Sequence, residues 1–226
     1  MENKSIALDG PSGAGKSTLA KRAAEHFGLI YVDTGAMYRC VGLYVLRNGF
    51  DSKDIDNILK LLPEIKLEMS YDAGGIQRMF LNGEDVTEAI RLPEVSTYAS
   101  DVSAFPQVRD FLLNMQREMA IKYNVVMDGR DIGTVVLPNA GLKVFITAKP
   151  ETRAKRRFDE LIQKIPNVKF EDVLAEMNIR DANDSNRAVA PLKAADDSIT
   201  LDTSDLNFEE SFEALCELIR KVHYDG

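Results

Sequence analysis

The sequence predicts an α/β fold with a parallel sheet, and three observations indicate it. Short apolar runs alternate with segments of helical periodicity, which is typical of βαβ units. Most of these runs end beside Asp, Gly, Ser or Thr, which are common where strands lead into binding sites. The 226 residues are 45% hydrophobic and 28% charged, which leaves out collagen-like and disordered chains and allows a core without disulfides.

Five apolar runs are the candidate strands of the central sheet. Ligands of open α/β sheets bind beyond the carboxyl ends of the strands, so we expect the chemistry at Asp9-Gly10, Asp33-Thr34-Gly35, Asp128-Gly129 and Asp202-Thr203-Ser204. The predicted inner strands are Ser5–Leu8, Leu29–Val32, Asn124–Met127, Lys143–Thr147 and Ser198–Leu201.

The pattern changes between Leu61 and about Ala104. Two alternating runs, Lys66–Tyr71 and Gln77–Leu81, are joined by Asp72-Ala73-Gly74-Gly75 and predict an antiparallel hairpin in an inserted lobe. Helical periodicity then predicts a helix from Pro106 to about Tyr123 and an amphipathic closing helix over Asn207–His223.

Composition excludes several classes of function. Asp and Glu outnumber Lys and Arg by 36 to 28, and a net charge of −8 repels polyanions, so we expect no nucleic-acid partner. No window is long and apolar enough for a signal peptide or a membrane span, so we expect a cytoplasmic protein without a membrane partner. Cys40 and Cys216 predict no disulfide framework, and His26 and His223 have no neighbours at zinc-ligand spacing.

The first chemical motif is Gly10-Pro11-Ser12-Gly13-Ala14-Gly15-Lys16-Ser17, which matches the G-x-x-x-x-G-K-[ST] phosphate loop and is followed by Thr18. Its glycines let the backbone N–H groups converge on phosphate oxygens, and the next helix adds its positive end. We expect Lys16 to bridge the β- and γ-phosphates of ATP and the Ser17 hydroxyl to bind Mg²⁺. A glycine-rich turn without a nucleotide is the alternative.

The loop predicts a nucleoside triphosphate and leaves the reaction open. No Lys is followed two residues later by Asp, so the guanine-reading N-K-x-D element is missing. A small-molecule kinase with another acceptor, or a P-loop ATPase or switch, remain alternatives at this point.

Late arginines supply more candidates. Arg153, Arg156 and Arg157 share one face of a helix that begins after Pro150, and either form a solvated basic face or close a lid on the ATP phosphates. In the predicted helix over Phe170–Arg187, the residues at offsets 0, 4 and 7 lie on one stripe, which is either an internal salt-bridge ladder or a ligand site. These residues are Arg180, Asp184 and Arg187.

Five ordered segments resemble the bacterial cytidylate kinases. The resemblance implies a three-layer P-loop kinase fold in one domain over residues 1–226, with a five-stranded parallel sheet, a monophosphate-binding lobe at about 34–104 that contains a small antiparallel sheet, and a lid at about 150–187. It also implies transfer of the ATP γ-phosphoryl group to CMP or dCMP with Mg²⁺. The segments are Gly10–Ser17, Asp33-Thr34-Gly35-Ala36-Met37-Tyr38-Arg39, Phe105-Pro106-Gln107-Val108-Arg109, Asp128-Gly129-Arg130-Asp131-Ile132-Gly133-Thr134-Val135-Val136 and Asn186-Arg187-Ala188-Val189-Ala190-Pro191-Leu192.

The same resemblance implies roles for individual residues. It assigns Thr34, Arg39 and Arg130 to the CMP phosphate; Ser100, Arg109 and Asp131 to the cytosine; and Arg180, Asp184 and Arg187 to the sugar and phosphates. We expect Lys16, Arg130, Arg157 and Arg187 to act on the transferred phosphoryl group, and Gly10–Thr18 with Arg153 and Arg156 to bind ATP. Asp128 is the candidate for orienting Mg²⁺ through water, with Asp33 as its rival.

Elementary chemistry agrees with the assignment to cytosine. The cytosine amino group needs an acceptor such as Asp131, and a ring acceptor needs a donor such as Arg109. Uracil presents a carbonyl instead, so UMP should be a poor substrate. Asp131 as a purely structural partner of Arg109 or Arg130, and Ser100 as an ordinary helix residue, remain alternatives. No assembly motif is visible, so we expect a monomer.

Overall fold

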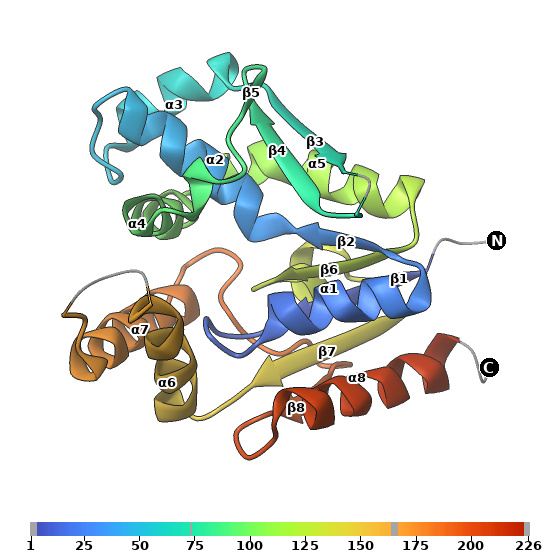
Figure 1. The fold of residues 1–226 in the computed structure, drawn as a ribbon. Helices are drawn as coiled ribbons and strands as arrows, with labels where there is room; N and C mark the ends of the chain where they lie inside the picture. Colours follow the sequence, from blue (N-terminus) through green and yellow to red (C-terminus); the bar gives the residue numbers. More distant parts are fainter. Residues whose placement is uncertain (1–3, 73, 164–166, 224–226) are drawn as a thin grey trace.

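The computed structural model describes residues 4–72, 74–163 and 167–223, and a five-stranded parallel sheet runs through its centre (Figure 1). The strand order is β2-β6-β1-β7-β8, and every pair in this sheet is parallel. All five predicted strands are confirmed, with ends that shift by at most two residues. They are β1 (Ser5–Asp9), β2 (Ile30–Asp33), β6 (Val125–Gly129), β7 (Leu142–Thr147) and β8 (Ile199–Asp202).

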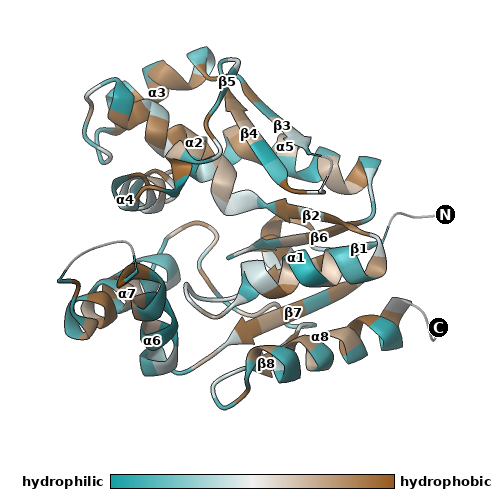
Figure 2. Ribbon diagram, viewed as in Figure 1, coloured by the Kyte–Doolittle hydropathy of each residue, from teal (hydrophilic) through white to brown (hydrophobic). Residues whose placement is uncertain are grey.

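Alternation along β1 builds the two faces of the sheet. Ile6 and Leu8 pack with α1 (Lys16–Phe27) and α8 (Phe208–His223), whereas Ala7 belongs to the core on the opposite face. Buried residues of α8 recur at helical spacing, and Figure 2 shows the resulting mixture of apolar and polar colours along this helix. The sheet is therefore the middle layer of three. Two expectations are corrected, because β2 and β8 were predicted as inner strands but lie at the two edges of the sheet, and β8 is mostly exposed.

A second, smaller sheet forms the inserted part of the chain. It has the order β3 (Leu67–Tyr71), β4 (Gln77–Leu81) and β5 (Glu84–Asp85), all antiparallel, with Leu67 opposite Leu81. The predicted hairpin is confirmed, although Ala73 of its predicted turn lies outside the described residues. Strand β5 was not predicted because two residues are too short to show a period.

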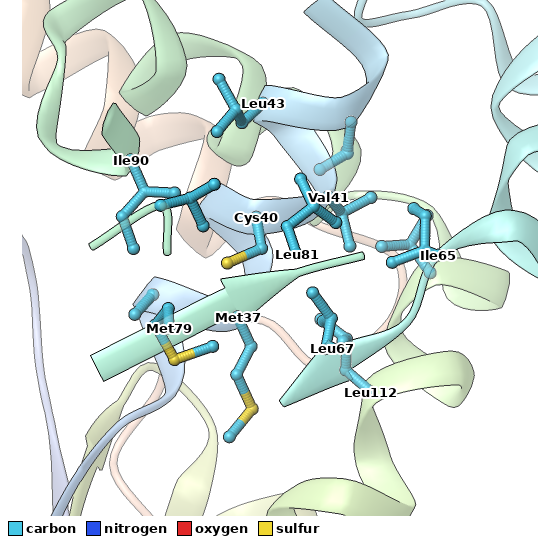
Figure 3. Close-up of a cluster of buried hydrophobic side chains, with 14 of the residues drawn as sticks. Met37, Cys40, Val41, Leu43, Ile65, Leu67, Met79, Leu81, Ile90 and Leu112 are labelled. Atoms are coloured by element: carbon cyan, nitrogen blue, oxygen red, sulfur yellow. The ribbon is translucent and has the colours of Figure 1, made fainter. Parts of the chain in front are cut away.

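One apolar core joins the small sheet to the central sheet. Met37, Cys40 and Val41 from α2 (Thr34–Arg47) point toward Met79 and Leu81 (Figure 3). The same core includes residues of the remaining helices on this side and of the turn after β6. These elements are α3 (Ile55–Leu61), η1 (Leu62–Glu64), η2 (Ala89–Arg91), α4 (Pro93–Val102), α5 (Pro106–Lys122) and η3 (Ile132–Val136).

Helices α6 (Pro150–Leu161) and α7 (Phe170–Ser185) have a small core of their own, with residues 164–166 of their connection outside the described residues. The predicted helix over Phe170–Arg187 is too long. Helix α7 ends at Ser185, where Asn186 caps it, so Arg187 is not on the helical stripe of Arg180 and Asp184. Within the described part of the chain, no helix is both long and apolar enough to cross a membrane.

Candidate active site

The phosphate-loop motif forms the turn between β1 and α1. Gly10, Gly13 and Gly15 have φ angles of 146°, 74° and 87°, a region that favours glycine. A Cβ on Gly10 would lie 1.9 Å from the carbonyl oxygen of Ile146, and one on Gly13 would lie 2.7 Å from Cε of Met177 in α7. The loop therefore needs glycine both for its path and for the close approach of β7 and α7.

Lys16 is the first residue of α1 and is buried at the centre of the site. Its Nζ donates a 2.7 Å hydrogen bond to the carbonyl oxygen of Pro11. Burial and the charge of Arg130 lower the pKa of Lys16, and the carboxylates of Asp128 and Asp9 oppose this change. A cation held near other cations favours an anionic ligand, because the ligand would relieve their repulsion.

The structure brings Asp128, rather than Asp33, into contact with the loop. Ser17 Oγ donates to Asp128 Oδ2 at 2.7 Å, and Tyr31 Oη donates to the other carboxylate oxygen at 3.1 Å. Thr34 Oγ1 donates to the main-chain oxygen of Asp128 at 2.8 Å. Burial and the nearby charge of Asp33 raise the pKa of Asp128.

Asp33 is occupied by two guanidinium groups. Its Oδ2 lies 2.8 Å from Arg39 Nη2 and 3.0 Å from Arg91 Nη1, and its Oδ1 caps α2 by accepting from the Ala36 amide at 2.9 Å. Although burial acts to raise the pKa of Asp33, Arg39 and Arg91 lower it below its ordinary value. The main chain of Asp33 is in turn held by the Gln77 side chain of the small sheet.

The turn after β6 meets the end of α7 through an ion pair. Arg130 Nε lies 2.8 Å from Asp184 Oδ2, and Asp184 is buried. Arg187, which follows the helix, donates from Nε to the Asp184 main-chain oxygen at 3.2 Å. Although burial acts to raise it, Arg130 and Arg187 lower the pKa of Asp184, which stays a carboxylate between them.

Unpartnered donors mark the point where the arginines converge. Burial and the charge of Arg130 lower the pKa of Arg180 to about 10, and the charges of Arg39 and Arg157 add to this effect. Arg180 in turn lowers the pKa of Lys16, so these cations surround a common region. Among the described residues, the buried side-chain nitrogen and oxygen atoms without a hydrogen-bond partner are Arg39 Nε, Arg180 Nε, Arg187 Nη2 and Asp181 Oδ1.

Asp131 and Arg109 form a buried ion pair through Oδ2 and Nη2. Arg109 also donates from Nη1 to the main-chain oxygen of Ser103 at 3.2 Å, and its guanidinium carbon lies 5.4 Å from the centre of the Tyr38 ring. The Ser103 hydroxyl donates to the Ser100 main-chain oxygen at 2.8 Å. The predicted cytosine-binding residues thus lie together between α4, α5 and the turn after β6.

The three arginines of α6 have different surroundings, although they were predicted on one face. Arg153 is buried and lies 2.6 Å from Asp181 Oδ2, and it donates to the Ser12 main-chain oxygen at 3.0 Å. Arg156 donates to both oxygens of Thr203. Arg157 is partly exposed and pairs with Glu160 on its own helix.

Comparisons with known proteins show which family has a site of this kind. A family model described as cytidylate kinase matches residues 6–221. The chain belongs to the cytidylate kinase family. It is 51% identical to a cytidylate kinase of Caldicellulosiruptor bescii and 49% identical to one of Flavobacterium johnsoniae, with 98% of each chain covered in both cases.

A solved structure of an uncharacterized protein from Eubacterium ventriosum is similar in fold alone, with a TM-score of 0.51, 15% identity, and 98% of this chain and 99% of that chain covered. Membership in the cytidylate kinase family confirms the resemblance and the predicted enzyme class, a nucleoside monophosphate kinase. The alternatives of a different acceptor or of a P-loop ATPase or switch are not favoured.

Sequence reasoning missed several residues of this cytidylate kinase site. Arg91 lies in a short 3-10 turn without a motif, so no pattern marked it. Ser103 accepts from Arg187 Nη1 at 3.2 Å, a contact between residues far apart in sequence. Asp9 was noted only as a strand end, although its place directly before the phosphate loop was a usable signal.

Proposed function

We propose that the chain transfers the γ-phosphoryl group of ATP to CMP or dCMP, giving CDP or dCDP. The cluster of cations around Lys16 carries this proposal, because Arg130 and Arg180 lie near enough to lower the pKa of Lys16. Among the described residues, Arg39, Arg180 and Arg187 each keep one buried N–H donor without a partner. A buried donor without a partner costs about 1–3 kcal/mol. Phosphate oxygens supply the acceptors that these donors lack.

At the ATP end, the backbone amides of Gly10–Thr18 bind the phosphates, and Lys16 reaches between the β- and γ-phosphates. Arg153 supports the loop through the Ser12 oxygen, and Arg156 lies beside Gly15, whose added Cβ would be 3.9 Å from Nη1. Arg157 is the arginine of α6 with the most freedom to turn toward the transferred group, because it is partly exposed and pairs with Glu160 at the surface of its own helix.

The residues present fit Mg²⁺. This ion prefers oxygen ligands, keeps several waters and uses few protein groups. Ser17 is an exposed residue whose hydroxyl lies beside the Asp128 carboxylate. Ser17 would bind the ion directly and Asp128 would orient its water. When bound, Mg²⁺ neutralises phosphate charge.

At the acceptor end, we assign Thr34, Arg39 and Arg130 to the phosphate of CMP. Asp33 holds Arg39 in place, and Asp184 does the same for Arg130, so both guanidinium groups are oriented before the substrate arrives. Arg180, Asp184 and Arg187 bind the sugar and the phosphates. Asp131 accepts from the cytosine amino group, Arg109 donates to the ring, and Ser100 lies beside them.

The chemistry requires positioning rather than a general base. A phosphate monoester with a second pKa of about 6 is mostly dianionic at neutral pH, so its oxygen attacks the γ-phosphorus directly. The cations offset the negative charge of the phosphoryl group during its transfer. The lid at about 150–187 closes with the lobe at about 34–104 to exclude water. We expect small-molecule partners only, a monomer and a cytoplasmic location.

An acceptor panel tests the proposal. ADP release is measured with ATP, Mg²⁺ and CMP, dCMP, UMP, AMP or GMP as acceptor. We expect release with CMP and dCMP and far less with the others. Preference for a purine or for UMP would overturn the proposed acceptor, and equal release without any acceptor would indicate an ATPase.

A further inference from the structure

Asp9 is a buried carboxylate that the proposed mechanism does not use. It is the last residue of β1 and is 5% exposed. Its Oδ1 accepts from the Ile132 amide at 2.8 Å, and its Oδ2 accepts from the Gly133 amide at 2.7 Å. Both oxygens of Asp9 thus hold the turn that follows β6.

Those two amides open the π-helical turn η3. The first N–H groups of any helix lack partners within the helix, and the side chain of the preceding residue commonly accepts from them. That residue is Asp131, yet within the described part of the chain its side chain makes no capping hydrogen bond to this turn. The Asp131 carboxylate pairs with Arg109 instead.

From this exchange of roles, we infer that Asp9 is a positioning residue for acceptor selectivity. By capping η3 in place of Asp131, Asp9 leaves the Asp131 carboxylate free to face Arg109 and the pyrimidine. The inference rests on the proposed function, since it names what sets the selectivity of that same site.

The turn has little freedom to compensate for a lost cap. A Cβ on Gly133 would lie 3.3 Å from Asp9 Oδ2 and 3.1 Å from Cδ of Lys143. Lys143 is itself anchored, because its Nζ donates to the Pro138 main-chain oxygen at 2.6 Å and to Asp197 at 2.8 Å. The backbone of η3 is therefore held between Asp9 and Lys143.

Asp9 also directly precedes the phosphate loop. Its neighbour in the chain is Gly10, and its neighbour across the sheet is Gly129, directly before Arg130. A single side chain therefore fixes the turn that carries Arg130 and Asp131 relative to the loop that carries Lys16.

Asp9→Asn tests the inference. Asparagine keeps one carbonyl oxygen as an acceptor but presents an NH₂ group in place of the other oxygen. One of the two main-chain N–H groups of η3 then loses its acceptor and becomes available to the Asp131 carboxylate. We expect the ratio of kcat/KM for CMP to that for UMP to fall about tenfold, while the KM for ATP stays within about twofold. Asp205→Asn is the control, because it removes an exposed carboxylate that pairs with Lys149 and takes no part in holding this turn, and its ratio should equal that of the wild type.

Two more variants make the test decisive. In an Asp131→Asn background, adding Asp9→Asn should cause no further loss of selectivity, because Asp9 acts through Asp131. If Asp9→Asn does not fold, Gly133→Ala crowds the same hydrogen bond from the turn and should lower the ratio similarly.

Equal losses of efficiency with CMP and UMP in a folded variant, or an additive loss in the double variant, would overturn the inference. So would a wild-type ratio in Gly133→Ala. Failure of the proposed function looks different, since the wild-type enzyme would then show no preference for CMP over UMP.

Discussion

The Ser17 hydroxyl donates to Asp128 across a separation of 111 positions in the sequence. The contact exists because β1 and β6 are neighbours in the central sheet, so the end of β6, which carries Asp128, lies beside the loop and helix that follow β1. Tyr31 holds the second oxygen of Asp128, which fixes the carboxylate beside the phosphate loop.

This contact predicts the effect of Asp128→Asn. The amide keeps the shape of the side chain but removes the charge that orients water on Mg²⁺. We expect the Mg²⁺ concentration for half-maximal rate to rise about tenfold. This is the lower limit of the loss in metal affinity that is usual when a group that orients a metal ligand is removed. Asp33→Asn is the control, because Asp33 contacts arginines rather than Ser17, and a larger Mg²⁺ effect there would reverse the assignment.

Lys16→Ala should reduce turnover on the order of 10²–10³-fold, as expected for loss of one positive group that acts on the transition state. The fold should persist, since the substitution also removes a buried charge that its surroundings disfavour. Steady-state rates and circular dichroism check both parts. Lys155→Ala, at a surface position on α6, should leave turnover unchanged. Near-normal turnover of Lys16→Ala would remove the phosphate-loop assignment.

Asp131→Ala should lower kcat/KM for CMP by at least about tenfold, because one good pair of base contacts is worth about 1–3 kcal/mol. It also leaves Arg109 without its carboxylate. The KM for ATP should change little, since the Asp131 side chain pairs with Arg109 rather than with the phosphate loop. Equal losses for both substrates would show that Asp131 serves the structure alone.

Arg39→Gln should raise the KM of CMP, dCMP and UMP by a similar factor, about tenfold, because a phosphate contact does not depend on the base. Arg78→Gln is a suitable control, since Arg78 pairs with Asp72 and Asp85 at the surface of the small sheet. An effect confined to the cytosine nucleotides would contradict the phosphate role.

The raised pKa of Asp9 predicts that the free energy of unfolding depends on pH. Burial raises its pKa to about 6, with Asp131 adding to the effect and the two amides and Lys16 opposing it. Because the folded-state pKa lies above the unfolded value, the folded state binds more protons between about pH 4 and 6, and the contribution of Asp9 to stability falls as the pH rises through this window. The loss is about 3 kcal/mol, from roughly 2 units at 1.4 kcal/mol each.

Urea unfolding of the wild type and of Asp9→Asn measures this change. The difference in unfolding free energy, wild type minus variant, should fall by about 3 kcal/mol between about pH 4 and 7, because the variant has no group to titrate there. A difference that stays constant with pH would show that the Asp9 carboxyl titrates alike in both states.

Much of the fold could be predicted from local pattern. The buried strands and the hairpin have clear apolar periods, and the phosphate loop marks its own strand and helix. The missed features depend on tertiary contacts. Strand β5 is defined by pairing with Phe80 and Leu81, and α7 stops at Ser185 although no Gly or Pro marks that end. The edge position of β8 follows from strand order, which no single run shows.

For the site, residue type and motif were sufficient to name most members but not their partners. The pairing of Arg39 with Asp33, and of Arg130 with Asp184, depends on elements that meet only in the folded chain. Arg153 illustrates the limit, because its spacing with Arg156 suggested a shared role, whereas burial against α7 and the loop gives it a different environment. Capping of η3 by Asp9 could not be seen in the sequence, since 123 positions separate Asp9 from Ile132.

In the proposed reaction, ATP and CMP bind at the same time, with the γ-phosphate of ATP next to the phosphate of CMP at the cations around Lys16. An analogue that joins adenosine and cytidine through a chain of five phosphates tests it most directly in steady-state inhibition. The account predicts competition with ATP and with CMP alike, and much weaker inhibition of Arg39→Gln. Competition with ATP alone would contradict a shared site for the two substrates.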